Sequence, residues 1–173
     1  MLYFAYGSCM DYRDFYRTCP NALLASPKAC LPRYRLRFNG YSFGRGGGVA
    51  NIEPSPSHTV VGVLWDVPKS DWARLERREG APRVYHRRAI EVKTEGGGVV
   101  KAFTYVLTQP SFVDYAPSPE YRRLILQGIP DFRYAQEVKE FIITLDKEET
   151  MDDQRTRTRT KWRTVQPLAK TLF

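Results

Sequence analysis

Short apolar and aromatic runs recur along most of the chain and predict strands that are interrupted by a few helices. The first run, residues 2–6, ends at Gly7-Ser8, and residues 10–16 behind it are expected to form a helix entered from a tight turn. Within residues 34–107, runs rich in Val, Ile, Tyr and Phe are separated by turn residues. This spacing predicts an antiparallel, barrel-like sheet.

One helix, about residues 69–79, is predicted inside this strand-rich region. Trp72 and Leu75 lie three positions apart and would share one face of the helix. Gly80 and Pro82 follow at positions where helices commonly end. The helix is therefore expected to end directly before Gly80.

Two further helices are predicted behind the sheet. Ser118 is a favourable N-cap and Pro119 is favoured at the first helical position, so a helix should begin there and end at Gly128. A last helix is expected at about residues 134–145.

Length and charge distribution predict one domain followed by a basic tail. A chain of 173 residues fits a single domain, because domains commonly run from roughly 50 to 250 residues. We expect this domain to span residues 1–150. Residues 151–173 carry six basic and two acidic side chains, which is half of the net charge of +8. The Arg-Thr repeat at 155–160 is compatible with an edge strand, but such stretches are more often solvated or disordered.

Composition argues against several classes of protein. The hydrophobic fraction of 42% is sufficient for a buried core, and no apolar stretch reaches the roughly 20 residues that cross a bilayer. The amino terminus lacks the features of a secretory signal, so a cytoplasmic location without membrane association is expected. The positive charge attracts nucleic acid nonspecifically, but the basic tail contains no recognition module, so no specific nucleic-acid partner is expected.

Cysteine and histidine usage predicts neither disulfides nor a metal site. Cys9, Cys19 and Cys30 are an odd number in a chain long enough to fold without covalent links, which favours reduced thiols. Only His58 and His86 are available as imidazole ligands, and no cysteine pair has zinc-ligand spacing.

The first candidate for chemistry is the loop within residues 3–10. A strand that runs into a glycine-containing loop and a helix start presents several unpaired backbone N–H groups, which suit an anion or an oxyanion. Alternatively, Gly7 merely permits a tight turn and the aromatic residues belong to the core. A serine nucleophile at Ser8 is disfavoured, because the segment does not fit the G-x-S-x-G pattern.

The second candidate is Glu79, in the last turn of the helix at 69–79. A carboxylate there faces the negative end of the helix dipole, and burial would add to the preference for its neutral form. Both effects raise a pKa toward the range useful for proton transfer. The alternative is an exposed Glu79 that pairs with Arg77, Arg78 or Arg83.

Tyrosines form a third candidate group. Tyr105, on a predicted strand, and Tyr121, in the segment 117–121, can close a polar pocket with apolar walls, although tyrosines in such elements usually belong to the core. Arg45 precedes three glycines, but this segment lacks the Gly-Lys-Ser/Thr ending of a phosphate-binding loop. We expect a flexible hairpin connection there and no nucleotide.

Taken in order, several segments resemble the gamma-glutamylcyclotransferase family, which includes AIG2-like proteins. The most specific are a Tyr-Gly-Ser turn after the first strand and a Leu-Glu-x-x-Glu-Gly element followed closely by a tyrosine. The likeness covers about residues 2–128 and implies an α+β fold, with a small mixed, barrel-like, mostly antiparallel sheet flanked by helices. The segments that carry it are residues 3–10, 47–52, 61–65, 75–80, Tyr85, Tyr105 and 117–121.

The resemblance also implies an activity and a site. It implies an enzyme that cyclises a gamma-glutamyl amide or peptide to 5-oxoproline and releases an amine or amino acid, without a cofactor or metal. The glutamate matching Glu79 is the family's general acid/base, and the loop holds the gamma-glutamyl group largely through backbone N–H groups. The implied substrate-binding residues are Tyr6, Gly7, Ser8, Cys9, Met10, Tyr105 and Tyr121.

Two positions depart from the family pattern. Cys9 stands where Asn is common, and Glu76 stands where Asp is common. We expect Cys9 at the mouth of the pocket and not as a nucleophile, because the attack comes from the substrate's own amine. Several leaving groups stay open: an alpha-amino acid, a dipeptide as in glutathione, a lysine side chain or an antibiotic amine. The alternative function is a non-catalytic binding or interaction module on the same fold.

Overall fold

The computed structural model describes residues 1–163, with side chains through residue 152, and contains a closed five-stranded barrel. The strand order around the barrel is β1-β3-β2-β4-β5. All neighbouring strands are antiparallel except β1 and β5, which run parallel and pair at Tyr3 and Phe103. The strands are β1 (Leu2–Ala5), β2 (Leu23–Ser42), β3 (Gly47–Asp66), β4 (Tyr85–Thr94) and β5 (Val99–Leu107). The predicted barrel-like, mostly antiparallel sheet is confirmed.

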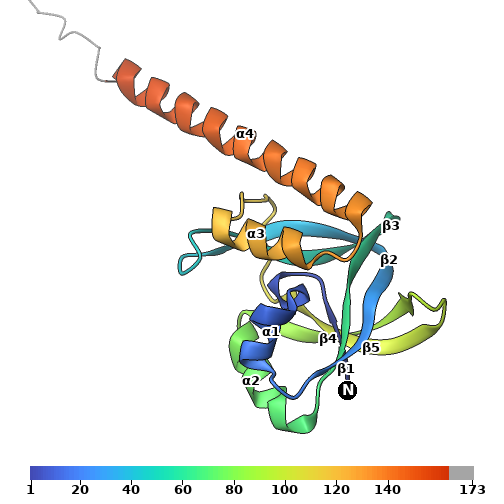
Figure 1. The fold of residues 1–173 in the computed structure, drawn as a ribbon. Helices are drawn as coiled ribbons and strands as arrows, with labels where there is room; N and C mark the ends of the chain where they lie inside the picture. The colour runs from blue at the N-terminus through green and yellow to red at the C-terminus, as the bar shows by residue number, and fades with distance from the viewer. Residues whose placement is uncertain (164–173) are drawn as a thin grey trace, which may run out of the picture.

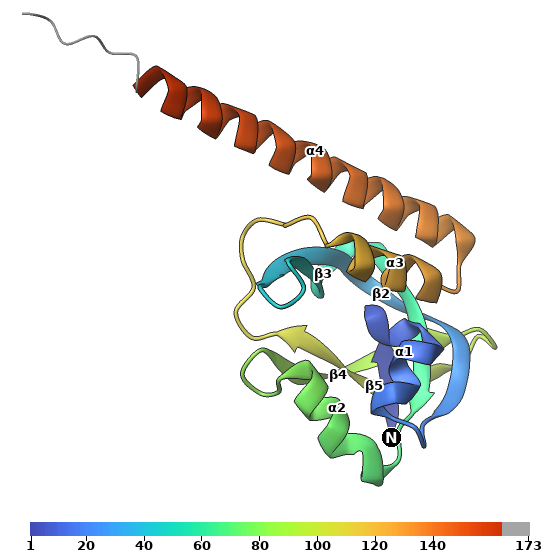
Figure 2. The same cartoon turned by 60° about the vertical axis from the view of Figure 1, so that its left-hand side comes forward.

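Helices cover the barrel on two sides (Figures 1 and 2). Helices α1 and α2 lie together against one side, and α3 lies between the barrel and the first turns of α4. Beyond α3, the long α4 runs outward past the barrel (Figure 1). The helices are α1 (Tyr12–Thr18), α2 (Trp72–Glu79), α3 (Pro119–Gly128) and α4 (Phe132–Arg163), and short 3-10 turns at Ser8–Met10 and Lys69–Asp71 precede α1 and α2.

The local end signals read from the sequence act as expected. Helix α2 ends at Glu79, and Gly80 adopts the left-handed conformation with φ 62°, which favours glycine. Helix α3 begins after Ser118, whose hydroxyl oxygen accepts a hydrogen bond from the Tyr121 N–H at 3.4 Å. Pro119 occupies the first position of that helix.

The last helix is much longer than the predicted segment 134–145. Helix α4 continues to Arg163, through the Arg-Thr repeat at 155–160, where an edge strand or a disordered segment was expected. Neither Gly nor Pro occurs within residues 131–163, and the segment is rich in Glu, Lys, Arg and Gln, which favour helix. The expected boundary at residue 150 thus falls inside α4. The rest of the predicted tail, residues 164–173, lies outside the described residues.

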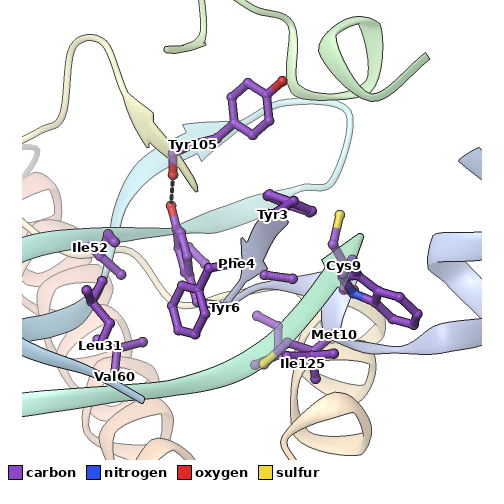
Figure 3. Close-up of a cluster of buried hydrophobic side chains, with 14 of the residues drawn as sticks. Tyr3, Phe4, Tyr6, Cys9, Met10, Leu31, Ile52, Val60, Tyr105 and Ile125 are labelled. Carbon is purple, nitrogen blue, oxygen red and sulfur yellow. Dashed lines mark hydrogen bonds between the residues drawn. The ribbon is translucent and has the colours of Figure 1, made fainter. Parts of the chain in front are cut away.

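Aromatic packing in the barrel holds β1 in place. The Phe15 ring stacks on Trp65 with centroids 4.7 Å apart, and Tyr3 stacks on Phe103 at 5.4 Å. Figure 3 shows the neighbouring cluster, in which Phe4 and other apolar side chains fill the interior. Complete burial of such a side chain contributes roughly 1.5–3 kcal/mol. The core therefore fixes the strand that leads into the loop at residues 7–10.

Two long-range contacts then position this loop. A Cβ atom at Gly62 would lie 2.2 Å from the Ala5 carbonyl oxygen, so only glycine allows β1 to approach β3 so closely. From the same strand, the Trp65 indole N–H donates to the Cys9 carbonyl at 3.0 Å. Contacts with β3 therefore hold both the end of β1 and the loop that follows it.

The described residues contain neither a helix that could span a membrane nor a cluster of metal ligands. Within residues 1–163, no helix combines the length and apolar character needed to cross a membrane. Among the side chains that the structure describes, no group of three or more His, Cys, Asp or Glu residues is placed to hold a metal ion.

Candidate functional site

A narrow cavity of about 40 Å³ lies where the loop after β1 meets the end of α2. Strands β3, β4 and β5 and helix α3 complete its wall. Half of its lining residues are tyrosines, and the others include one carboxylate and one thiol. The lining residues are Tyr3, Tyr6, Gly7, Ser8, Cys9, Ala50, Glu79, Tyr85, Tyr105 and Tyr121.

The structure brings all but one of the residues that the sequence singled out to this cavity. The exception is Met10, which is buried but does not line the cavity. Its side chain packs toward Gly128 of α3, where an added Cβ atom would lie 2.7 Å from the Met10 Cβ. Met10 therefore supports the loop from the α3 side.

Glu79 is the single carboxylate of the cavity, and its environment disfavours its charge. It is the last residue of α2 and is partly buried. Burial of the carboxyl group raises the pKa of Glu79 above its ordinary value, while the cationic groups of Arg78 and Arg45 and the Cys9 thiol partly oppose this rise. A carboxyl group with a raised pKa can accept and return a proton near neutral pH.

Cys9 lies inside the cavity wall, so its expected place at the mouth is wrong. It is only 4% exposed, and its Sγ donates to Glu79 Oε1 at 3.5 Å (Figure 3 shows its position beside Tyr3). Burial and the neighbouring Glu79 raise the pKa of the Cys9 thiol to about 12. Cys9 is therefore a neutral thiol that supplies a hydrogen bond, which is unlike an activated thiolate nucleophile.

Arg78 connects the loop at residues 7–10 to helices α1 and α2. Its guanidinium group donates to Ser8 Oγ at 3.1 Å and to Thr18 Oγ1 at 2.8 Å, and it forms an ion pair with the Asp14 carboxylate. Arg78 thereby joins the loop, α1 and α2. The alternative of an exposed Glu79 paired with a nearby arginine does not describe this site, because Glu79 is partly buried and forms no ion pair among the described residues. The carboxylate partner of Arg78 is Asp14.

Phenol groups brace the wall opposite Glu79. The Tyr6 hydroxyl donates to the Tyr105 carbonyl at 2.5 Å (Figure 3). On β3, the Ala50 carbonyl accepts from the Tyr85 hydroxyl at 2.8 Å, and the Ala50 N–H donates to the Tyr121 hydroxyl oxygen at 3.3 Å. Burial raises the pKa of Tyr121 to about 12, so this phenol is neutral. These phenol groups form an uncharged part of the wall that hydrogen bonds hold to the backbone.

Tyr105 and Tyr121 contribute differently, and Tyr3 is one of two lining tyrosines that were missed. Tyr105 offers its carbonyl group to Tyr6, whereas its ring points away from Tyr6 in Figure 3 and its buried hydroxyl has no hydrogen-bond partner among the described residues. Tyr85 lines the cavity as well, although it was not among the expected substrate-binding residues. The sequence signal that could have identified Tyr85 is its position shortly after the Leu75–Gly80 segment.

The cavity adjoins a groove of about 510 Å³. Ser8, Glu79, Tyr85 and Tyr121 line both spaces. Arg45, expected only to form a hairpin connection, lies in the turn between β2 and β3 and lines the groove.

A larger groove, of about 860 Å³, lies between α4 and strands β2 and β3. Two of its three acidic groups are already engaged: Asp114 pairs with Arg37 at 2.7 Å, and Asp131 pairs with Lys28 at 2.5 Å. The third, Glu137, is exposed to solvent on α4. The pKa of Asp131 is lowered by its hydrogen bond from Lys28, which is the opposite of the shift at Glu79. We therefore place the candidate active site at the smaller cavity.

Comparisons with known proteins identify the family to which the chain is similar. The family model described as gamma-glutamyl cyclotransferase, AIG2-like, matches residues 3–127, a range that contains every residue lining the cavity. A gamma-glutamylcyclotransferase of Mus musculus is 30% identical to this chain over 153 residues, covering 86% of this chain and 80% of the mouse protein. The Bos taurus gamma-glutamylcyclotransferase is 32% identical over 133 residues, covering 73% and 69%. A solved structure named gamma-glutamyl cyclotransferase has a TM-score of 0.74 and 28% identity to this chain, covering 80% of this chain and 86% of its own.

Proposed function

Because the chain belongs to the gamma-glutamyl cyclotransferase, AIG2-like family, we propose that it is an enzyme that cyclises gamma-glutamyl amides or peptides to 5-oxoproline. Each turnover would release the amine or amino acid that was attached to the gamma-carbonyl group. The observation that carries this proposal is Glu79, a carboxyl group with a raised pKa in a small polar cavity beside the loop at residues 7–10.

The proposed reaction is intramolecular. The alpha-nitrogen of the substrate forms a bond to the gamma-carbonyl carbon, and the bond from that carbon to the leaving nitrogen then breaks. Because both reacting groups belong to one molecule, the protein chiefly has to hold a folded conformer of the substrate. No electrons are gained or lost overall, so the step needs no redox cofactor.

Glu79 is the proposed proton carrier. As a carboxylate it takes the proton that the alpha-nitrogen loses, and it then delivers this proton to the leaving nitrogen. The Cys9 thiol holds Oε1 of this carboxyl group at 3.5 Å. Arg78 anchors the helix end by its bonds to Ser8 and the Asp14 carboxylate. The carboxyl group thus stays oriented while its charge changes.

The loop supplies the proposed donors for the oxyanion that forms on the gamma-carbonyl oxygen. The Met10 N–H closes the 3-10 turn on the Gly7 carbonyl at 3.0 Å. The earlier N–H groups, of Ser8 and Cys9, precede the first intrahelical donor and have no acceptor within the turn. Fixed backbone donors of this kind stabilise developing negative charge. The neutral phenol groups of Tyr6 and Tyr121 would close the site around the substrate.

We further propose that the enzyme acts in the cytoplasm without a metal. Cys9, Cys19 and Cys30 are free thiols in the structure, which is typical of a reducing compartment. Activity that disappears with a chelator and returns with one particular metal ion would contradict the metal-independent mechanism.

The test is a screen of gamma-glutamyl compounds for release of 5-oxoproline by the full-length protein. The compounds should include gamma-glutamyl amino acids, glutathione and gamma-glutamyl-lysine, and the product is measured by chromatography with mass detection. Formation of 5-oxoproline from at least one of them is expected. Tight binding of these compounds without product would instead favour the non-catalytic binding module.

A further inference from the structure

The groove outside the cavity is unusually rich in arginine. Four guanidinium groups line it, and Glu79 is its single acidic residue within the part of the chain that the structure describes. Since Glu79 is assigned to proton transfer, the groove has a surplus of positive charge. The four are Arg45, Arg77, Arg78 and Arg83.

Three of these arginines have no carboxylate partner among the described side chains. Arg78 is paired with Asp14, but no ion pair of the described residues involves Arg45, Arg77 or Arg83. All three are exposed to solvent. Like charges that surround one groove repel each other, and a bound anion would relieve this repulsion.

Arg45 stands nearest to the chemistry. Its guanidinium carbon lies 4.5 Å from the centroid of the Tyr121 ring, a cation–π contact that orients the Arg45 side chain. The positive charge of Arg45 also partly opposes the rise in the pKa of Glu79 that burial causes. The guanidinium group therefore lies within electrostatic reach of the proposed proton carrier. Arg45 is therefore a cation held at the mouth of the cavity.

The volumes of the cavity and the groove indicate which part of a substrate would lie beside these arginines. A cavity of 40 Å³ holds only a few water-sized groups, since one water needs about 10–15 Å³ measured in this way. Anything beyond the reacting end of the substrate must lie in the groove of about 510 Å³. The groove is therefore where the leaving amine would extend.

We propose that this groove is the subsite for the leaving group, and that it selects gamma-glutamyl compounds whose leaving amine carries two carboxylates, such as a glutamate or aspartate residue. Arg45 binds one carboxylate at the cavity mouth, and Arg77 and Arg83 attract the other. This inference rests on the proposed cyclotransferase function. It chooses an acidic amino acid among the leaving groups that the sequence left open and disfavours a lysine side chain or another cationic amine.

The test compares four substrates that differ in the charge of the leaving group. They are gamma-glutamyl-glutamate with two carboxylates, gamma-glutamyl-alanine with one, gamma-glutamyl-butylamine with none, and gamma-glutamyl-putrescine with a cation. We expect kcat/KM for 5-oxoproline release to decrease in this order, by about twofold to fivefold for each charge, because ion pairs with solvent-exposed arginines are of this strength. Added salt should compress the differences.

Variants assign the selectivity to the groove. Arg45→Ala should lower the ratio of kcat/KM for the dicarboxylate over the neutral compound by about threefold to fivefold. Arg45→Glu should turn the preference toward gamma-glutamyl-putrescine. Arg74→Ala is the matched control, because Arg74 is an exposed arginine of the same helix as Arg77 but does not line the groove. Its ratio should match that of the unmodified protein.

The outcomes separate this inference from the proposed function. Equal kcat/KM for all four compounds would overturn the leaving-group subsite while the cyclotransferase activity stands. Release of 5-oxoproline from none of them would overturn the proposed activity for these substrates. The subsite would then be tested separately, by calorimetric measurement of how tightly the Glu79→Gln variant binds these compounds. Tighter binding of gamma-glutamyl-glutamate than of gamma-glutamyl-butylamine, lost on adding Arg45→Ala, supports the subsite, and equal binding overturns it.

Discussion

The two sides of the last turn of α2 each carry a glutamate, and the two glutamates have different environments. Glu79 lines the cavity and accepts a hydrogen bond from the Cys9 thiol, and burial raises the pKa of its carboxyl group. Glu76, three residues earlier, faces outward and pairs with Arg87, with side-chain exposures of 37% and 46%. Both lie at the negative end of the same helix dipole. Burial, and not helix position, therefore accounts for the raised pKa of Glu79.

The largest expected effect is on catalysis by Glu79. Glu79→Gln keeps the size of the side chain but removes the titrating group, so kcat for 5-oxoproline release should fall by about 10²–10⁴-fold. Circular dichroism and the thermal unfolding midpoint should show an intact fold. Since burial of the ionised carboxyl group opposes folding, this variant should be at least as stable as the parent at pH 7.

Removal of Arg78 should have the largest effect on stability. Arg78→Ala leaves the Asp14 carboxylate unpaired and the Ser8 hydroxyl without its donor, where both side chains of the ion pair are only 18% exposed. The free energy of unfolding, measured with urea, should decrease by about 2–3 kcal/mol. The neighbouring exposed Arg77 provides the control, since Arg77→Ala should change stability by no more than about 0.5 kcal/mol. Equal losses for the two variants would show that the Arg78 contacts are not structural.

A smaller effect on catalysis is expected for Cys9→Ala, and it should be visible in the pH dependence of kcat/KM. The acid limb of kcat/KM should reflect the raised pKa of Glu79, with activity lost as the pH falls through that pKa and the carboxylate becomes protonated. Cys9→Ala removes a hydrogen bond that favours the carboxylate, so this limb should move to higher pH. Turnover near the optimum should fall by no more than about tenfold, the worth of one hydrogen bond to a charged group. Complete loss of turnover in a folded protein would indicate covalent catalysis by Cys9.

The smallest effect is expected at Glu76. Glu76→Gln breaks an exposed ion pair with Arg87, so stability should change by less than about 1 kcal/mol. Turnover should stay within about twofold, because the side chain does not line the cavity. If Glu76→Gln abolished turnover while Glu79→Gln did not, the roles of the two glutamates would have to be exchanged.

Local signals in the sequence determined much of the framework. The left-handed Gly80 ends α2 directly after Glu79, and Ser118 with Pro119 begins α3, because each of these effects acts within one helical turn. The recurring short apolar runs likewise predicted the barrel, since alternation along a strand reflects a single buried face. The end of α4 was missed because the expectation relied on charge and overlooked the absence of helix breakers.

Contacts between distant residues were decided only in the tertiary structure. The sequence indicated Glu79, but its raised pKa depends on a cavity wall from β1, β3, β4, β5 and α3, which meet only when the barrel closes. Closure also turns Met10 toward α3 and brings Arg45 to the mouth of the cavity, 34 positions from Glu79. Helix ends are set by neighbours along the chain, whereas desolvation and charge proximity depend on distance in space, so the chemistry of this site emerged only from the fold.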